Sequence, residues 1–338
     1  MKTKILFRAD GNEKIGLGHL YRLFALVEIY KEYYNYDFVT RETSATEIIP
    51  DSYNIKIIPK ELAILDEPKW LSECYKDPKL IIIADGYEYT SAYQKRIKEL
   101  GFQLIYIDDL AIETLYADCV VNHSPYVKPS HFCKQEYTQL ALGLSYAILR
   151  PEFLKVAQEK KQIKKIDSVF ICFGGADFFD LTYKSTQALL TFSNVKKIHI
   201  ILGASYKHNA IYDLVKNNKN ILTLHSNLNE LELLHIMKKS NFGIVPSSTI
   251  CYELCSVKMP ILSGYFVDNQ ELIYKGFVEK NVIFEGGNLK NYSVNDFTKK
   301  INEIFQYPKE KYEEQIKNQY ALFDGQQKER FLSLIKAL

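Results

Sequence analysis

The chain has 338 residues, too many for one ordinary hydrophobic core and a good fit to two α/β domains. Apolar residues make up 47% of it and charged residues 25%, as in a globular protein. The net charge of +2 argues against the strongly basic surface that binds nucleic acid, so we expect no such partner. No apolar run approaches the roughly 20 residues that a membrane helix needs. The N-terminus shows no signal peptide, so we expect a cytoplasmic protein without stable membrane insertion.

The six cysteines form no Cys-x-x-Cys pair, and a chain of this length does not need disulfides for stability. Cys251 and Cys255 would share one face of a helix, but two thiols without nearby histidines make a poor metal site. We therefore expect buried thiols, no metal and no cofactor.

Short β-type runs alternate with helical patterns through the first half of the chain. Apolar residues recur at helical spacing at Leu20, Leu23 and Val27, and again at Tyr93 and Ile97. Apolar strands that alternate with helices predict βαβ units and a mostly parallel sheet. The expected strands are residues 4–9, 37–40, 55–58, 80–84, 103–107 and 119–122.

The pattern breaks near residues 149–153, and a lysine-rich polar stretch follows to residue 165. The alternation then restarts, with expected strands at 169–173, 198–202, 221–224, 242–245, 261–264 and 282–284. We predict two Rossmann-like domains (residues 1–150 and 166–308) facing across a cleft, a linker at 151–165 and a helical tail at 309–338. Ligands of such sheets bind outside the carboxyl ends of the strands, so motifs at strand ends are candidate sites.

A glycine turn that carries a histidine follows the first strand. The segment Gly16-Leu17-Gly18-His19 leads into a helix, and glycines let the backbone come close to a ligand. The positive end of the helix disfavours a protonated imidazole, so His19 is expected to be largely neutral near pH 7 and able to act as a general base. A helix-capping or simply exposed histidine is the alternative.

The same turn does not fit a nicotinamide dinucleotide site. Tyr21 stands where the third glycine of that fingerprint should be, and the second strand closes with Thr40-Arg41 rather than with an acidic residue.

A second motif, residues 246–253, follows the strand at 242–245. Ser247, Ser248 and Thr249 begin a helix, where hydroxyls cap free amides and the helix end can hold a diphosphate without a metal. Glu253, one turn later, is suited to bind a ribose diol through two hydrogen bonds. An ordinary helix cap with a surface glutamate is the alternative.

Three weaker elements also end strands. Asn269 and Gln270 open a further helix and carry amides suited to sugar hydroxyls. Gly174, in Phe173-Gly174-Gly175-Ala176-Asp177, permits close backbone approach. Tyr87 follows Asp85-Gly86 at the end of a first-domain strand.

These residues resemble the UDP-sugar hydrolase family of pseudaminic acid biosynthesis, often called PseG, which is related to spore-coat polysaccharide proteins. The matching pieces run in the family's order. They are Arg8-Ala9-Asp10, residues 15–19 with Arg22, residues 107–110, Val121-Asn122, the long run 142–153, residues 173–177, Ser247-Ser248-Thr249 with Glu253, and Asp268-Asn269-Gln270.

The resemblance implies a GT-B fold and hydrolysis of UDP-2,4-diacetamido-2,4,6-trideoxy-β-L-altropyranose, with water attacking the anomeric carbon and inversion of configuration. It implies His19 as the catalytic residue, Tyr87 and Asn269 on the sugar side, and Ser248 and Glu253 on the nucleotide side. We add Arg8, Asp10, Gly16, Gly18, Asn122, Gly174 and Gln270 as substrate-binding candidates, and Ser247 and Thr249 as nucleotide-binding ones.

Three positions depart from the family pattern and put the sugar's substituents in doubt: Gly86, Phe178 and Pro246 stand where histidine, proline and glycine are common. The expected partner is a small-molecule UDP-sugar, and the expected state is a monomer. Two other functions stay open. One is a glycosyltransferase that passes the sugar to an alcohol, and the other is a UDP-sugar binding protein without turnover.

Overall fold

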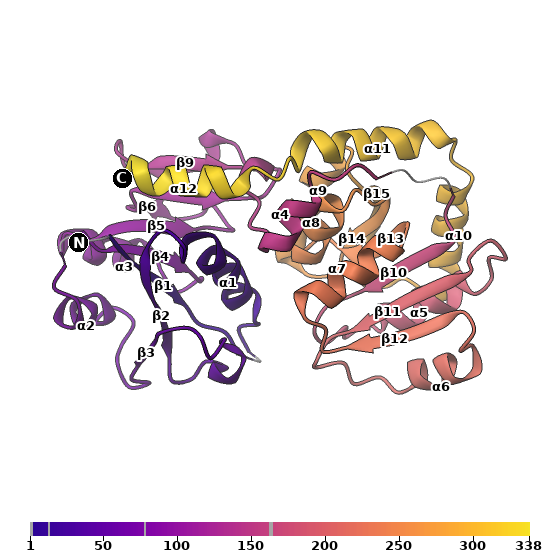
Figure 1. Cartoon of the computed structure of the whole chain (residues 1–338), viewed down its shortest axis with the longest axis horizontal. Coiled ribbons are helices and arrows are strands. Elements are labelled where there is room, and N and C mark those ends of the chain that lie inside the picture. Colours follow the sequence, from indigo (N-terminus) through magenta and orange to yellow (C-terminus); the bar gives the residue numbers. More distant parts are fainter. Residues whose placement is uncertain (1–2, 13, 78, 162–164) are drawn as a thin grey trace. The chain divides into compact units, whose positions relative to one another are not determined.

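The computed structural model describes residues 3–12, 14–77, 79–161 and 165–338. The chain forms two compact units. The first unit comprises Met1–Pro151 together with Gln326–Leu338, and the second comprises Glu152–Gly325. Each unit is a parallel sheet flanked by helices (Figure 1), the α/β class that the alternation of strands and helices predicts.

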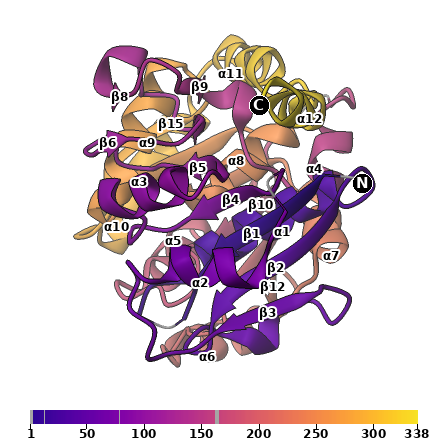
Figure 2. The same ribbon diagram turned by 90° about the vertical axis from the view of Figure 1, so that its left-hand side faces the viewer.

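The first unit has a seven-stranded sheet in the order β3-β2-β1-β4-β5-β7-β9, part of which is seen in Figure 2. All its pairings are parallel. The strands are β1 (Lys4–Ala9), β2 (Asn35–Arg41), β3 (Ile55–Ile58), β4 (Ile81–Asp85), β5 (Gln103–Ile107), β7 (Cys119–Asn122) and β9 (Gln139–Leu142). The helices are α1 (Gly18–Tyr30), α2 (Glu67–Cys74), α3 (Ser91–Glu99) and α12 (Gln327–Ala337), and β6 (Thr114–Leu115) pairs separately with β8 (Cys133–Lys134).

The second unit has a six-stranded sheet in the order β12-β11-β10-β13-β14-β15. The strands are β10 (Ser168–Cys172), β11 (Lys197–Leu202), β12 (Leu222–Ser226), β13 (Phe242–Pro246), β14 (Ile261–Tyr265) and β15 (Phe284–Asn288). The helices are α4 (Pro151–Val156), α5 (Leu181–Leu189), α6 (Ala210–Asn217), α7 (Glu230–Lys239), α8 (Thr249–Ser256), α9 (Asp268–Glu279), α10 (Val294–Phe305) and α11 (Lys309–Leu322).

The central strands are apolar because helices cover both faces of each sheet. All five residues of β4 and of β10 are buried. Sequence periodicity predicts the bounds of β1, β3, β5 and β7 as the structure has them. It misses β9, an edge strand in which only Ala141 is fully buried and Gln139 is exposed, so the apolar signal there is weak.

The strand order reverses once in each sheet. In the first unit the reversal lies between β1 and β4, and in the second between β10 and β13. Loops diverge on either side of such a switch point and leave a crevice at the carboxyl ends of the two strands. These two positions are therefore where a ligand is expected within each unit.

The C-terminal residues 309–338, expected as one helical tail, divide between the two units. Helix α11 packs in the second unit, where the Gln319 side-chain amide donates to the carbonyls of Met259 (2.8 Å) and Val282 (2.9 Å). Helix α12 packs in the first unit, where the Tyr30 hydroxyl donates to the carbonyl of Phe331 (2.6 Å). The expected linker also contains α4, and its residues 162–164 lie outside the described part of the chain.

No helix within the described residues combines the length and the apolar character needed to cross a membrane.

Replacing Phe331 by alanine is expected to destabilise the first unit, because this side chain is buried (1% exposed) in the contact of α12 with the rest of that unit. Large-to-small changes of a buried phenylalanine cost about 3–5 kcal/mol. Hydrogen exchange should then show faster exchange of the amides of β1, β4 and α1, while β10 and β13 keep their protection. The exposed Lys336→Ala on the same helix is the control, and loss of protection mainly in the second unit would contradict the assignment of α12.

Candidate active site

The crevice of the first unit is built at the ends of β1 and β4. These strands are paired in parallel, with Ala9 opposite Asp85 at their carboxyl ends. The loop after β1 turns at Gly16, whose φ of +88° favours glycine. Gly18 begins α1 and is exposed, with open space where a Cβ would lie. His19 follows in the first turn of α1, as the sequence predicts.

His19 is held by a buried carboxylate. Its Nδ1 lies 2.7 Å from Oδ1 of Asp85, and Asp85 is fully buried. The Nε2 atom of His19 has no hydrogen-bond partner among the described residues. A carboxylate at Nδ1 favours the tautomer with the proton on Nδ1, which leaves Nε2 as the proton acceptor. The arrangement suits an imidazole that takes a proton from a ligand or a water molecule.

Arg22, one turn further along α1, joins two carboxylates. Its Nε and Nη2 donate to Asp85 at 2.8 and 2.6 Å, and its Nη1 and Nη2 donate to Asp109 at 2.6 and 2.8 Å. Burial alone would raise the pKa of the Asp109 carboxyl, but the Arg22 guanidinium outweighs it and holds that pKa at about 2. Asp109 is therefore ionised at neutral pH. We call His19, Arg22, Asp85 and Asp109 the histidine cluster.

Tyr87 lies beside this cluster. Its ring meets the imidazole of His19 edge to face, with centroids 4.8 Å apart, and its hydroxyl is 3.5 Å from Oδ2 of Asp109. The side chain is 44% exposed. The structure thus brings together His19 and Tyr87, two site residues that lie far apart in the sequence.

Neither Asp85 nor His123 was predicted from the sequence to belong to the site. Asp85 ends the strand next to β1, so the predicted parallel sheet was the signal that could have paired it with His19. His123 directly follows β7, and its Nδ1 accepts a hydrogen bond from the backbone amide of Ile148 (3.3 Å). Burial, together with the charge of Arg22, lowers the pKa of His123 to about 4, so this imidazole is neutral.

Arg8 and Asp10, predicted to bind substrate, lie inside the first unit. The guanidinium of Arg8 is fully buried and donates to Glu67 (2.6 Å) and to Asp10 (2.8 Å). Asp10 also accepts from the amide of Arg41 (2.7 Å) and the hydroxyl of Ser44 (3.0 Å). These contacts fix the loop after β2 against the loop that leads to His19, so both residues support the site from within.

Asn122, a further substrate-binding candidate, is also buried. Its amide group donates to Asp108 (3.1 Å) and accepts from the backbone of Ser124 (3.0 Å). In this arrangement it shapes the loop that carries His123.

The crevice of the second unit lies between the ends of β10 and β13. Gly174, with a φ of +84°, follows β10 and is exposed. Gly203 approaches it so closely that a Cβ on Gly203 would lie 2.3 Å from the Gly174 carbonyl. Ser247 follows β13 and shares a hydrogen bond with the hydroxyl of Ser263 (2.9 Å). Ser248 and the exposed Thr249 then open α8. We call Ser247–Thr249 the serine turn.

The two helices that start at this switch point differ in their first amides. At α5, the Asp177 carboxylate accepts from the amides of Leu181 (2.9 Å) and Thr182 (2.8 Å). At α8, no side chain caps the helix, although the residue at the cap position is Ser248. The prediction that hydroxyls cap these amides is wrong, because the Ser247 hydroxyl turns to Ser263 instead. Of these two helices, α8 is the one whose first backbone amides are not bound by a side chain. Its start is therefore the better candidate to bind an anion.

The other predicted residues of the second unit lie in α8 and at the start of α9. Glu253 lies in α8 and is only 4% exposed, so it is not the surface glutamate of the alternative reading. Asn269 is exposed in the first turn of α9, whereas the Gln270 side chain accepts from the amide of Phe266 (3.2 Å). The rings of Phe179 and Phe266 meet at 6.0 Å and link the loops after β10 and β14, the two strands that flank β13.

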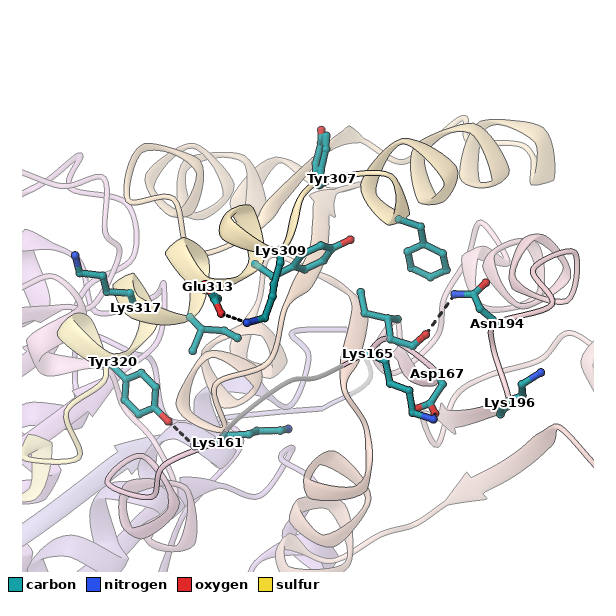
Figure 3. A pocket seen from close by; sticks show the side chains of 14 residues that line it. Lys161, Lys165, Asp167, Asn194, Lys196, Tyr307, Lys309, Glu313, Lys317 and Tyr320 are labelled. Atoms are coloured by element: carbon teal, nitrogen blue, oxygen red, sulfur yellow. Dashed lines mark hydrogen bonds and ion pairs between the residues drawn. The ribbon is translucent and has the colours of Figure 1, made fainter.

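A cavity of about 1130 Å³ in the second unit lies elsewhere. Figure 3 shows it between α11 and the residues that precede β10 and β11, such as Asp167 and Lys196, so it is at the amino ends of the strands. Four of its five lysines bond to protein groups, for example Lys309 to Glu313 at 2.6 Å. We therefore do not place the active site there. Among the described residues, no group of three or more His, Cys, Asp or Glu side chains is arranged to hold a metal ion.

Comparisons with known sequences agree with the motifs, although no family model matches the chain. The chain is 29% identical over 275 residues to the UDP-2,4-diacetamido-2,4,6-trideoxy-beta-L-altropyranose hydrolase of Campylobacter jejuni, covering 79% of this chain and 93% of that protein. It is 22% identical over 284 residues to the spore coat polysaccharide biosynthesis protein SpsG of Bacillus subtilis, covering 82% of both. It is 24% identical over 289 residues to the uncharacterized protein MJ1062 of Methanocaldococcus jannaschii, covering 82% of this chain but only 58% of that protein.

Solved structures match the fold over the whole chain. MurG of Acinetobacter baumannii aligns with a TM-score of 0.69 at 12% identity, covering 99% of this chain and 100% of that one. A glycotransferase of kitacinnamycin aligns with a TM-score of 0.68 at 10% identity, covering 100% and 99%.

These neighbours establish the two-domain GT-B fold class that the resemblance implies. The motifs and the alignments together confirm the resemblance, and the chain is a relative of the UDP-2,4-diacetamido-2,4,6-trideoxy-beta-L-altropyranose hydrolase and of SpsG.

Proposed function

We propose that the chain hydrolyses a UDP-sugar, removing UDP from UDP-2,4-diacetamido-2,4,6-trideoxy-β-L-altropyranose with inversion at the anomeric carbon. The observation that carries this proposal is the His19–Asp85 pair at the switch point of the first unit, with Nδ1 of His19 bound (2.7 Å) and Nε2 unpartnered among the described residues. The proposed substrate is the one for which the Campylobacter relative is named.

In the proposed reaction, Nε2 of His19 takes a proton from a water molecule that attacks the anomeric carbon on the face opposite UDP. The C–O bond to UDP breaks as the new C–O bond forms, which inverts the configuration. Asp85 keeps the imidazole in the tautomer and orientation that this proton transfer requires. Tyr87, beside the imidazole, and Asn269 are the proposed sugar-side contacts, with Gly16 and Gly18 allowing close approach.

UDP is the leaving group and would bind at the serine turn. The uncapped amides of α8, with the hydroxyls of Ser248 and Thr249, would meet the negative charge that develops on the diphosphate. Glu253 would bind the ribose diol, and Gly174 would allow the phosphates close to the backbone. This account uses protein groups alone, so it requires neither a metal nor a cofactor.

Replacing His19 by alanine should lower kcat by about 100-fold or more, the usual contribution of a general base, while the Kd for UDP stays unchanged. Asp85→Asn should lower kcat to a lesser extent, because the amide can still contact Nδ1 but no longer fixes its proton. UDP release and the anomer formed are followed by NMR without any added acceptor, and UDP binding is followed by calorimetry.

The exposed His131→Ala, in the same unit, is the control and should behave as wild type. Near wild-type turnover of His19→Ala would refute the assignment. UDP release that requires an added alcohol would identify a glycosyltransferase, and tight UDP-sugar binding without turnover would identify a binding protein. Loss of activity with EDTA would refute the helix-end account of the diphosphate.

Replacing Glu253 by glutamine should remove discrimination between ribose and deoxyribose. Wild type is expected to bind UDP about tenfold more tightly than 2′-deoxy-UDP, since a hydrogen bond to a charged group contributes about 1.5–3 kcal/mol. The variant should bind the two nucleotides with similar Kd values in calorimetry. The exposed Glu279→Gln should keep the wild-type preference, and an unchanged preference in Glu253→Gln would show that Glu253 does not contact the ribose.

A further inference from the structure

Arg22 is the one cation that contacts both carboxylates of the histidine cluster among the described residues. It shares Oδ1 of Asp85 with His19: that oxygen lies 2.7 Å from Nδ1 of His19 and 2.6 Å from Nη2 of Arg22. The guanidinium also lies 2.9 Å from Nδ1 of His19 itself. Its far side binds Asp109 through two hydrogen bonds. Arg22 thus lies between two carboxylates: that of Asp85, which orients His19, and that of Asp109.

With a neutral imidazole, the carboxylates of Asp85 and Asp109 and the guanidinium of Arg22 leave the histidine cluster with one net negative charge. Burial alone would lower the pKa of Arg22, but Asp109 and Asp85 raise it well above its usual value, so the guanidinium stays charged. The pKa of Asp109 is held at about 2 by Arg22 against the effect of burial. His123, from the loop after β7, is neutral because burial and Arg22 lower its pKa. Tyr87, from the loop after β4, also faces His19.

Two carboxylates without a cation would hold a proton on His19. An opposite charge within about 4–6 Å favours the charged form of a titratable group and moves its pKa by about one to three units. An unscreened Asp85, supported by Asp109, would therefore keep the imidazole protonated at neutral pH, and a protonated imidazole cannot accept a proton. Arg22 supplies the positive charge that offsets this effect while Asp85 still binds Nδ1.

We propose that Arg22 is a positioning residue whose charge opposes protonation of His19 by Asp85, so that Nε2 can serve as the base, and that Asp109 limits this effect by sharing the charge of Arg22. Arg22 acts through Asp85 and His19 and has no assigned contact with the substrate. The inference rests on the proposed role of His19 as the base, but the state of the imidazole can be measured without substrate.

The test titrates the imidazole of His19 by NMR in the full-length chain, with the resonance assigned through His19→Ala. Arg22→Met should raise the pH midpoint of His19 by about one unit, because a positive charge is removed. Asp109→Asn should lower the midpoint, because Arg22 then acts on Asp85 alone. Arg22→Lys should keep the midpoint near wild type while lowering kcat, because the charge remains and the two-carboxylate fork is lost.

The matched control is the surface pair Arg96 and Asp66, which are 3.8 Å apart with side chains 47% and 67% exposed. Arg96→Met and Asp66→Asn should leave the midpoint of His19 unchanged. The acid limb of the kcat/KM profile should move with the NMR midpoint in every variant.

Shifts of opposite sign in Arg22→Met and Asp109→Asn support the inference. A purely structural role predicts loss of activity without a change in midpoint, or shifts of the same sign, and either result overturns it. If Arg22→Met does not fold, two other variants test the inference. Asp109→Asn should lower the pH midpoint of His19, and Arg22→Lys should retain the wild-type midpoint. If the midpoints move as expected but wild type releases no UDP, the proposed function fails and this inference stands. If UDP is released but the midpoints do not move, the inference alone fails.

Discussion

The buried carboxylate of Asp85 is the contact on which the site of the first unit depends. A carboxylate with no solvent exposure must be compensated by hydrogen-bond donors or cations, and here His19 and Arg22 provide both from one face of α1. Because residues three apart on a helix lie on the same side, α1 can present both groups to one strand end. The same contact ties α1 to β4 and, through Arg22, to the loop after β5. Arg22 thus joins α1 to two segments, the end of β4 and the loop after β5, that are distant from it in the sequence.

Three helices, α5, α8 and α1, start at the carboxyl ends of the two sheets, and they differ in the residues at their first turns. α5 has its first amides bound by Asp177, a residue of the same loop. α8 has no side-chain cap, so its amides can serve a ligand. α1 likewise has no side-chain cap and carries His19 in its first turn. The positive end of a helix is the same physical feature in each case, and the residues placed there decide whether it stabilises the fold or binds an anion.

The sequence predicts much of this fold because parallel strands covered on both faces must be apolar. β1, β3, β5 and β7 are therefore predicted to the residue, whereas the edge strand β9, with an exposed Gln139, is not. His19 and the serine turn could be found because glycines and hydroxyl residues mark strand ends. The bond from Asp85 to His19 could not be found from spacing, because it depends on which strands are neighbours in the sheet. Capping of α8 by the hydroxyls of residues 247–249 was predicted from helix-start preference, which does not include the bond of the Ser247 hydroxyl to Ser263.

The return of α12 to the first unit has a consequence for how the chain is made. Residues 152–325 form a contiguous unit inserted into the other one, so the second unit can fold on the ribosome as soon as its residues have emerged. The first unit is discontinuous in sequence, and the partners of Tyr30 and Gln103 at Phe331 and Leu338 are translated after the whole second unit. Most of the unit that carries His19 is synthesised before the second unit, but it can be completed only after the second unit has been translated. Until then, the apolar surface that α12 covers stays open to solvent or to a chaperone.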